Sequence, residues 1–109
     1  MAMVVASVAC ATGGPGAAPG APAGVTFDGG GGLTCETRIV IHGAAGETAG
    51  IAAEHAWLRA HYPDHKPRRQ VLAECQQHPT DIMAITTADG RDIEVHFDIS
   101  EFFGKGFGL

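Results

Sequence analysis

Four segments of the chain have the apolar pattern of β-strands. The clearest is Arg91–Ile99, in which four apolar residues alternate with polar or charged ones. An alternation with period two places one set of side chains on each face of a sheet. The other expected strands are Leu33–His42, Arg69–Cys75 and Asp81–Thr87, with a loop at 76–80 around Pro79.

The spacing of apolar residues from Glu47 to His61 predicts a helix. We expect the helix to end before Pro63, because the residue preceding a proline disfavours the helical conformation. A narrow apolar stripe contains Ile51 and Leu58, a broader arc of small residues surrounds Trp57, and Glu54 lies between the two. Two apolar stripes indicate that one packs on the sheet while the other meets a further surface.

The last two expected strands are joined by a hairpin signal. Asp89-Gly90 is typical of a two-residue type I′ turn. That turn sets Ala84 opposite Val95 on the core face. Met83 and Ile85 then project from the other face of the sheet. The sequence therefore predicts a second, partly apolar sheet surface, which indicates either a partner or an incompletely covered sheet.

The order of elements, β-α-β-β-β, predicts an α+β fold. We expect a two-layer sandwich, with one helix packed on a mostly antiparallel four-stranded sheet. Between residues 11 and 32, 17 of 22 positions are Gly, Ala or Pro. Such a stretch buries too little apolar surface to offset the entropy of ordering its backbone. The sequence therefore predicts a disordered tail over residues 1–32 and a small domain over residues 33–109.

The charge and hydropathy of the chain argue against two classes of partner. The formal net charge is −5, from 12 acidic and 7 basic residues. A nucleic-acid-binding domain normally carries a basic footprint, so we expect no nucleic-acid partner. No stretch approaches the roughly 18 apolar residues of a transmembrane helix, so we expect no membrane span.

The chain has three cysteines, Cys10, Cys35 and Cys75. An odd, sparse set is not a disulfide framework, although a Cys35–Cys75 bridge is one alternative. We expect reduced, buried thiols instead, which are typical of a cytoplasmic protein. The apolar run that ends at Cys10 partly resembles a lipoprotein signal without its positive region. Export, or a lipid anchor on Cys10, is therefore the alternative location.

Two pairs of residues have the spacing of zinc ligands. They are His61 with His65 and Cys75 with His78, and together they would supply four tetrahedral ligands. Pro63 argues against this site, because a helix that ends there cannot align the first two histidines. Surface histidines and a buried thiol are the simpler interpretation, and a zinc site is the minor alternative.

Catalytic residue types are present without a recognised motif. The expected domain has one serine, Ser100, and no nucleophile-elbow sequence around it. Glu94 and Asp98 flank His96 on one face of the last expected strand, as the solvated face of an amphipathic strand would. A small metal-dependent or acid–base enzyme is the alternative function, drawing on these three residues and the four zinc candidates.

The leading interpretation is a small non-catalytic interaction module that self-associates as a homodimer or binds another protein. It is based on the second helix stripe, the second sheet surface and the Phe-rich C-terminal segment. Each candidate contact residue also suits a core position. The candidates are Trp57, Met83, Ile85, Phe102, Phe103 and Phe107.

Overall fold

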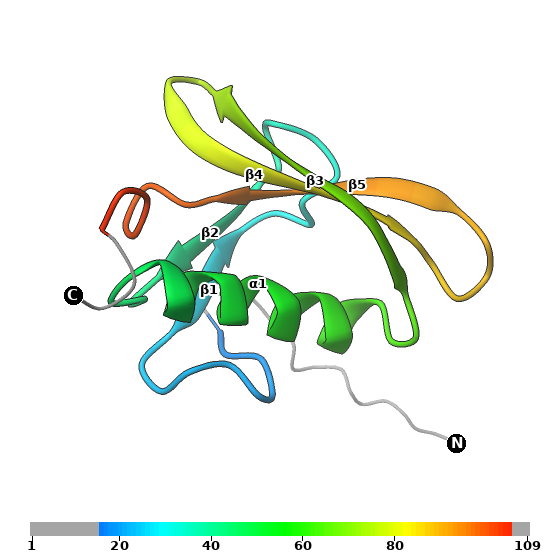
Figure 1. Ribbon diagram of the computed structural model, residues 1–109, viewed down its shortest axis with the longest axis horizontal. Coiled ribbons are helices and arrows are strands. Elements are labelled where there is room, and N and C mark those ends of the chain that lie inside the picture. The colour runs from blue at the N-terminus through cyan, green and yellow to red at the C-terminus, as the bar shows by residue number, and fades with distance from the viewer. Residues whose placement is uncertain (1–15, 106–109) are drawn as a thin grey trace, which may run out of the picture.

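The structure is a computed structural model that describes residues 16–105, and these form a two-layer α+β domain (Figure 1). Within these residues the single helix, α1 (Glu47–His61), lies against one face of a five-stranded mixed sheet. The predicted fold class and the single helix are confirmed. The strands are β1 (Thr26–Gly29), β2 (Ile39–His42), β3 (Lys66–Cys75), β4 (His78–Thr86) and β5 (Asp92–Asp98).

The sheet has one strand more than the sequence predicts. Its order is β1-β2-β5-β4-β3, in which β2 and β5 are parallel and the other neighbours are antiparallel. The extra strand, β1, lies within the segment expected to be a tail. Val25 and Phe27 are 3% and 7% exposed, so even this Gly-rich stretch carries enough apolar surface to add an edge strand. Residues 1–15 of the expected tail lie outside the described residues.

Helix α1 has the predicted bounds but one buried face instead of two apolar stripes. The pattern places Glu54 between the stripes. In the structure Glu54 is fully buried and joins them into a single covered surface with Trp57 and Leu58. Ile51, the first residue of the narrow stripe, is instead 37% exposed. No helix among residues 16–105 is long and apolar enough to cross a membrane.

A glycine allows the C-terminal segment to pack against α1. Phe102 is 2% exposed and lies over Gly50. A Cβ atom at Gly50 would come within 2.2 Å of the Phe102 ring. The close approach explains why a residue with poor helix propensity occupies the interior of the helix.

The first predicted strand is shorter than expected, and its leading half is a loop. Strand β2 covers only Ile39–His42, and Leu33 is 52% exposed. Within this loop Cys35 forms a disulfide with Cys75, the last residue of β3. The expectation of reduced thiols is therefore wrong, because the fold brings together two cysteines that are 40 residues apart.

The connection between β3 and β4 is a tight turn where a loop was expected. Gln76 and Gln77 have φ values of 53° and 71°, and Cys75 pairs with His78. Two consecutive residues with positive φ are the mark of a two-residue type I′ turn. Pro79 consequently lies inside β4, and β3 and β4 form a long hairpin (Figure 1).

The connection between β4 and β5 also differs from the predicted turn. The Thr87 N–H donates to the Arg91 carbonyl at 2.8 Å, and the Gly90 N–H donates to the Thr87 carbonyl at 2.9 Å. Gly90 has a φ of 91°. A three-residue loop with glycine in the left-handed conformation has this geometry, so the loop is one residue longer than the Asp-Gly signal predicts.

The longer loop moves the register of the hairpin by one residue. Met83 pairs with Val95, and Ile85 pairs with Ile93. A shift of one residue turns every side chain to the opposite face. Met83 and Ile85 therefore pack under α1, at 6% and 1% exposure, and the predicted second apolar sheet surface is wrong.

The hydrophobic core lies between α1 and the sheet. It draws on the helix, on strands β1, β2, β4 and β5, and on the segments before β1 and after β5. Its largest members include Phe27, Ile39, Ile41, Trp57, Leu58, Met83, Ile85, Val95, Phe97 and Phe102.

Candidate interaction surface

Strand β3 is a long edge strand that is exposed along most of its length. It has ten residues and pairs with β4 on one side only. Lys66 through Leu72 are all exposed, and only Cys75 at the far end is buried. Among residues 16–105 no strand pairs with its outer side. An edge of this kind presents unpaired N–H and C=O groups to any strand that can approach it.

The hydrogen bonds of β4 reveal which residues of β3 face the free edge. The Pro79 carbonyl accepts a bond from the Ile99 N–H at 3.0 Å, so the backbone at Pro79 is directed toward β5. Glu74, its partner in β3, must then direct its backbone groups away from β4. Because the orientation alternates along an antiparallel strand, Leu72 and Gln70 face the free edge as well.

Two apolar side chains flank this free edge. Val71 is 42% exposed and Leu72 is 57% exposed. Leu72 pairs with Asp81, which lies on the α1 face of the sheet in step with Met83. Val71 pairs with Ile82 and so lies on the opposite face. The edge thus has one exposed apolar side chain on each face of the sheet, Leu72 on the α1 face and Val71 on the opposite face.

The first part of β3 is protected against pairing. Pro67 has no N–H group, and a β-bulge falls between Pro67 and Arg69. Arg68 and Arg69 reach across the sheet to Asp92 at 3.5 Å and Glu94 at 3.4 Å. Proline, charge and bulges are the usual means by which proteins block an edge. The unblocked part of β3 is therefore the stretch from Gln70 to Glu74.

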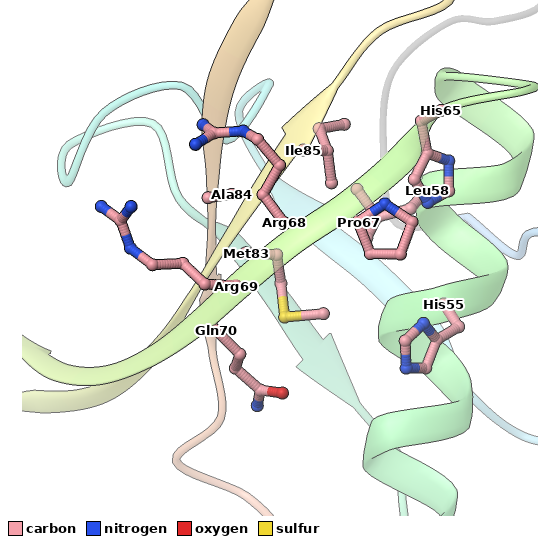
Figure 2. Close-up of a pocket in the computed structure, with 10 residues that line it drawn as sticks. All are labelled: His55, Leu58, His65, Pro67, Arg68, Arg69, Gln70, Met83, Ala84 and Ile85. Atoms are coloured by element: carbon pink, nitrogen blue, oxygen red, sulfur yellow. The ribbon is translucent and has the colours of Figure 1, made fainter.

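A cavity of about 220 Å³ lies between α1 and β3 (Figure 2). Met83, Ile85 and Leu58 are among its apolar lining residues, and His55 and His65 approach it from the helix side. The guanidinium groups of Arg68 and Arg69 point away from the helix. The remaining lining residues are Pro67, Gln70 and Ala84, so Gln70 belongs both to the cavity wall and to the free edge.

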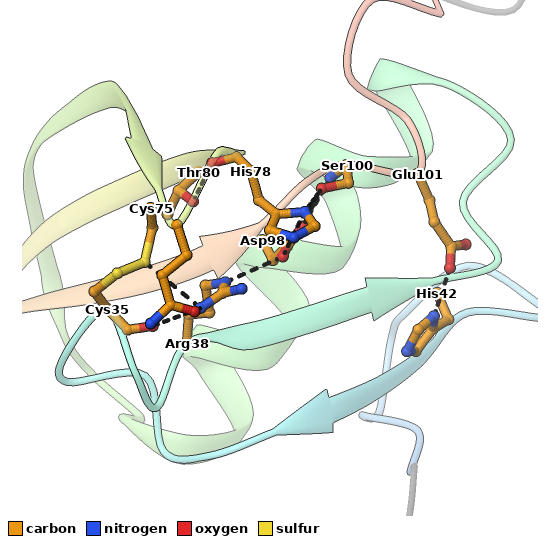
Figure 3. A network of polar contacts seen from close by, with 10 residues as sticks. Cys35, Arg38, His42, Cys75, His78, Thr80, Asp98, Ser100 and Glu101 are labelled. Atoms are coloured by element: carbon orange, nitrogen blue, oxygen red, sulfur yellow. Dashed lines mark hydrogen bonds and ion pairs between the residues drawn. A yellow bond between two sulfur atoms is a disulfide. The ribbon is translucent and has the colours of Figure 1, made fainter.

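A polar cluster joins the end of β5 to the disulfide (Figure 3). Arg38 donates to Asp98 at 3.1 Å, to the Cys35 carbonyl at 2.9 Å and to the Gln76 side chain at 3.2 Å. Burial works to raise the pKa of Asp98, but hydrogen bonds from Ser100 and Arg38 outweigh it, so the pKa lies below its ordinary value. The cluster holds the loop before β2 against the β3–β4 turn.

This cluster contains a serine, a histidine and an aspartate, yet its hydrogen bonds are not those of a catalytic triad. The Ser100 hydroxyl donates to Asp98 Oδ1 at 2.6 Å. His78 Nδ1 lies 3.0 Å from the Ser100 oxygen and must donate to it, since the serine has one hydrogen. A nucleophilic serine needs the reverse arrangement, in which the imidazole accepts the hydroxyl hydrogen.

One acidic side chain is buried without a well-formed hydrogen bond. Glu54 is 0% exposed, and neither of its carboxyl oxygens has a hydrogen bond of good geometry. Burial, reinforced by hydrogen bonding and charge repulsion from neighbouring Asp81, raises the pKa of Glu54 to about 10. Glu54 is therefore an uncharged acid at neutral pH, closed off from solvent beneath the helix.

Most of the interaction residues expected from the sequence lie in the core. Trp57, Met83, Ile85 and Phe102 are each 6% exposed or less, and Trp57 packs edge-on against Phe97 with ring centroids 5.6 Å apart. Phe103 is 45% exposed. Phe107 lies outside the described residues.

The zinc candidates are separated by the fold. His61 and His65 turn their Nδ1 atoms to the carbonyls of Trp57 and Tyr62, at 3.0 and 2.8 Å. Cys75 is in the disulfide and so has no thiolate to offer, and His78 contacts Ser100. Within the described part of the chain, no group of three or more His, Cys, Asp or Glu residues is arranged to hold a metal ion.

The other enzyme candidates are also occupied. Glu94 pairs with Arg69, and His96 Nδ1 lies 3.0 Å from the Gly32 carbonyl.

The sequence analysis missed the exposed apolar edge of β3, because Val71 shares strand parity with buried Cys75 and so resembles a core residue.

Searches against models of protein families, against curated proteins and against solved structures find no match to this chain.

Proposed function

We propose that this chain is a small non-catalytic interaction module that self-associates as a homodimer through the free edge of β3. The observation that carries the proposal is the stretch from Gln70 to Glu74, whose outward backbone groups have no described partner and whose Val71 and Leu72 are uncovered. Addition of a strand to such an edge satisfies the backbone groups and buries both side chains. In this proposal the β3 edge, and not the six contact residues expected from the sequence, forms the dimer interface.

The test is the solution mass of the full chain across the micromolar range, compared with that of Leu72→Pro. The Leu72 N–H faces the free edge, so a proline there blocks a partner strand and removes no bond to β4. We expect a dimer for the parent chain and a monomer of unchanged fold for Leu72→Pro. Val71→Pro is the matched control, because its N–H faces β4 and its loss lowers the unfolding temperature.

Either of two results contradicts the proposal. A parent chain that stays monomeric throughout the micromolar range rules out the homodimer. A Leu72→Pro variant that stays as dimeric as its parent shows that another surface makes the contact.

We also propose that the domain works in an oxidising compartment outside the cytoplasm. The support is the Cys35–Cys75 disulfide, since such bonds persist mainly in exported proteins. The cytoplasmic prediction depended on reduced cysteines and loses that support. Export through the segment that ends at Cys10, which lies outside the described residues, is the corresponding route. Intact-mass analysis of the native protein tests it, because an unprocessed chain recovered from the cytoplasm with two free thiols in the domain contradicts export.

A further inference from the structure

We infer that the two copies pair antiparallel about Val71, and that Leu72 of each copy enters the cavity between α1 and β3 of the other. The inference rests on the proposed function, because it specifies the register of that dimer. It identifies the occupant of the cavity as a side chain from a second copy of this chain.

The backbone of β3 permits this register. A two-fold axis at Val71 sets Gln70 opposite Leu72 of the partner subunit. Both residues direct their N–H and C=O groups to the free edge, so they form a hydrogen-bonded pair. Val71 then faces Val71 of the partner subunit in a non-hydrogen-bonded pair, where side chains approach most closely. A register shifted by one residue would oppose outward groups to inward ones, so the backbone allows only registers that differ by two residues, and the side chains select among them.

The side chains make the register self-complementary. Leu72 is 57% exposed and lies on the α1 face of β3, the face on which the cavity lies. Gln70, two positions back on the same face, is part of the cavity wall. Pairing Gln70 with Leu72 of the partner subunit brings that leucine to the cavity mouth, and symmetry repeats the contact.

The cavity has room for the leucine. Its volume is about 220 Å³, whereas an apolar cavity of about 150 Å³ accommodates a benzene molecule. Its lining contains both polar and apolar residues, and Leu58, Met83 and Ile85 supply the apolar contacts that a buried leucine needs. Filling the cavity supplies a buried anchor that a simple strand-to-strand contact lacks.

The charges along the edge agree with the same register. The basic residues Lys66, Arg68 and Arg69 occupy the first half of β3, and Glu74 lies in the second half. An axis at Val71 brings Glu74 of the partner subunit toward the basic residues just beyond the paired stretch. An axis nearer the start of the strand would instead bring the two basic stretches together, which is unfavourable between adjacent strands.

Disulfide trapping tests the register in the full chain carrying Cys10→Ser. Facing residues of a non-hydrogen-bonded pair have Cα atoms about 4.5 Å apart, within the range that a disulfide spans. Val71→Cys should therefore form a covalent dimer on mild oxidation. Gln70→Cys is the matched control, since its diagonal distance of about 7–8 Å is too long. A mixture of Gln70→Cys and Leu72→Cys should form the mixed dimer.

Leu72→Ala tests the occupied cavity, because it keeps the backbone edge and removes the anchor. We expect dimer affinity to fall at least tenfold with the fold intact. A dimer in which Val71→Cys does not cross-link, or in which Leu72→Ala binds as well as its parent, overturns this inference and leaves the proposed function standing. A monomeric parent chain overturns both.

Discussion

Glu54→Gln should stabilise the protein at neutral pH, although it replaces a charged residue type by its amide. Glu54 is fully buried, and neither oxygen has a well-formed hydrogen bond. Its pKa rises from 4.5 to about 10, with burial as the main cause. The folded protein therefore keeps the proton, whereas the unfolded chain releases it above pH 4.5. Each pH unit above that value favours the unfolded chain.

The size of the effect follows from the two pKa values. The stability that Glu54 contributes is fully present below pH 4.5 and is lost progressively as the pH rises toward about 10. At pH 7 the loss covers 7 − 4.5 = 2.5 pH units, or about 3 kcal/mol at 1.36 kcal/mol per unit. Glutamine has the same shape and does not titrate, so it should escape this loss.

Urea unfolding of both proteins, with the disulfide intact, at several pH values from 5 to 8 measures the difference. The free energies of unfolding should be close near pH 5 and should diverge to about 3 kcal/mol near pH 7, with glutamine the more stable. Asp81→Asn is a useful control, because it removes the lesser cause and should leave most of the pH dependence. A difference that does not grow with pH would show that Glu54 reaches water or a counter-charge.

Three further changes have defined outcomes. Gly50→Ala should lower the unfolding temperature, because the new methyl group would overpack against Phe102 at a cost of about 1–3 kcal/mol. This cost exceeds the gain of about 1 kcal/mol in helix propensity. A stabilised variant would contradict the close contact. Replacing both disulfide cysteines by serine should cost about 4 kcal/mol in urea unfolding, from a closed loop of 40 residues. Arg38→Met should cost up to about 3 kcal/mol at neutral pH, because Asp98 keeps its hydrogen bonds from Ser100 but loses its guanidinium partner. The deficit should shrink as the pH falls below 3.8, where Asp98 is protonated in the unfolded chain, and a deficit independent of pH would argue against the ion pair.

The helix was predictable because its signals are local, whereas the hairpin register was not. Asp89-Gly90 fits both a two-residue and a three-residue loop. The longer loop is selected by Thr87, whose hydroxyl accepts a bond from the Arg91 N–H at 3.0 Å and contacts the Asp89 carboxylate. That choice depends on side-chain bonds that strand periodicity does not reveal, and it reversed the faces assigned to Met83 and its neighbours.

The candidate surface was not predictable from the pattern of β3. Whether Val71 is buried depends on which strand lies beyond it, and the sequence does not give the strand order. The same holds for Glu54, since a charged residue between two apolar stripes normally points to solvent. Its burial follows from the way α1 lies on the sheet, where the covered surface is wide enough to include both stripes.

The last strand of the domain in chain order is the central strand of its sheet, and this constrains folding during synthesis. Strand β5 joins the β1–β2 pair to the β3–β4 hairpin and contributes Val95 and Phe97 to the core. A chain that has emerged only as far as residue 91 can form two separate hairpins, each marginal in water. Cooperative structure must therefore await the emergence of Asp92–Asp98, and until then the inner edges of both hairpins are open to chaperones or to a neighbouring nascent chain.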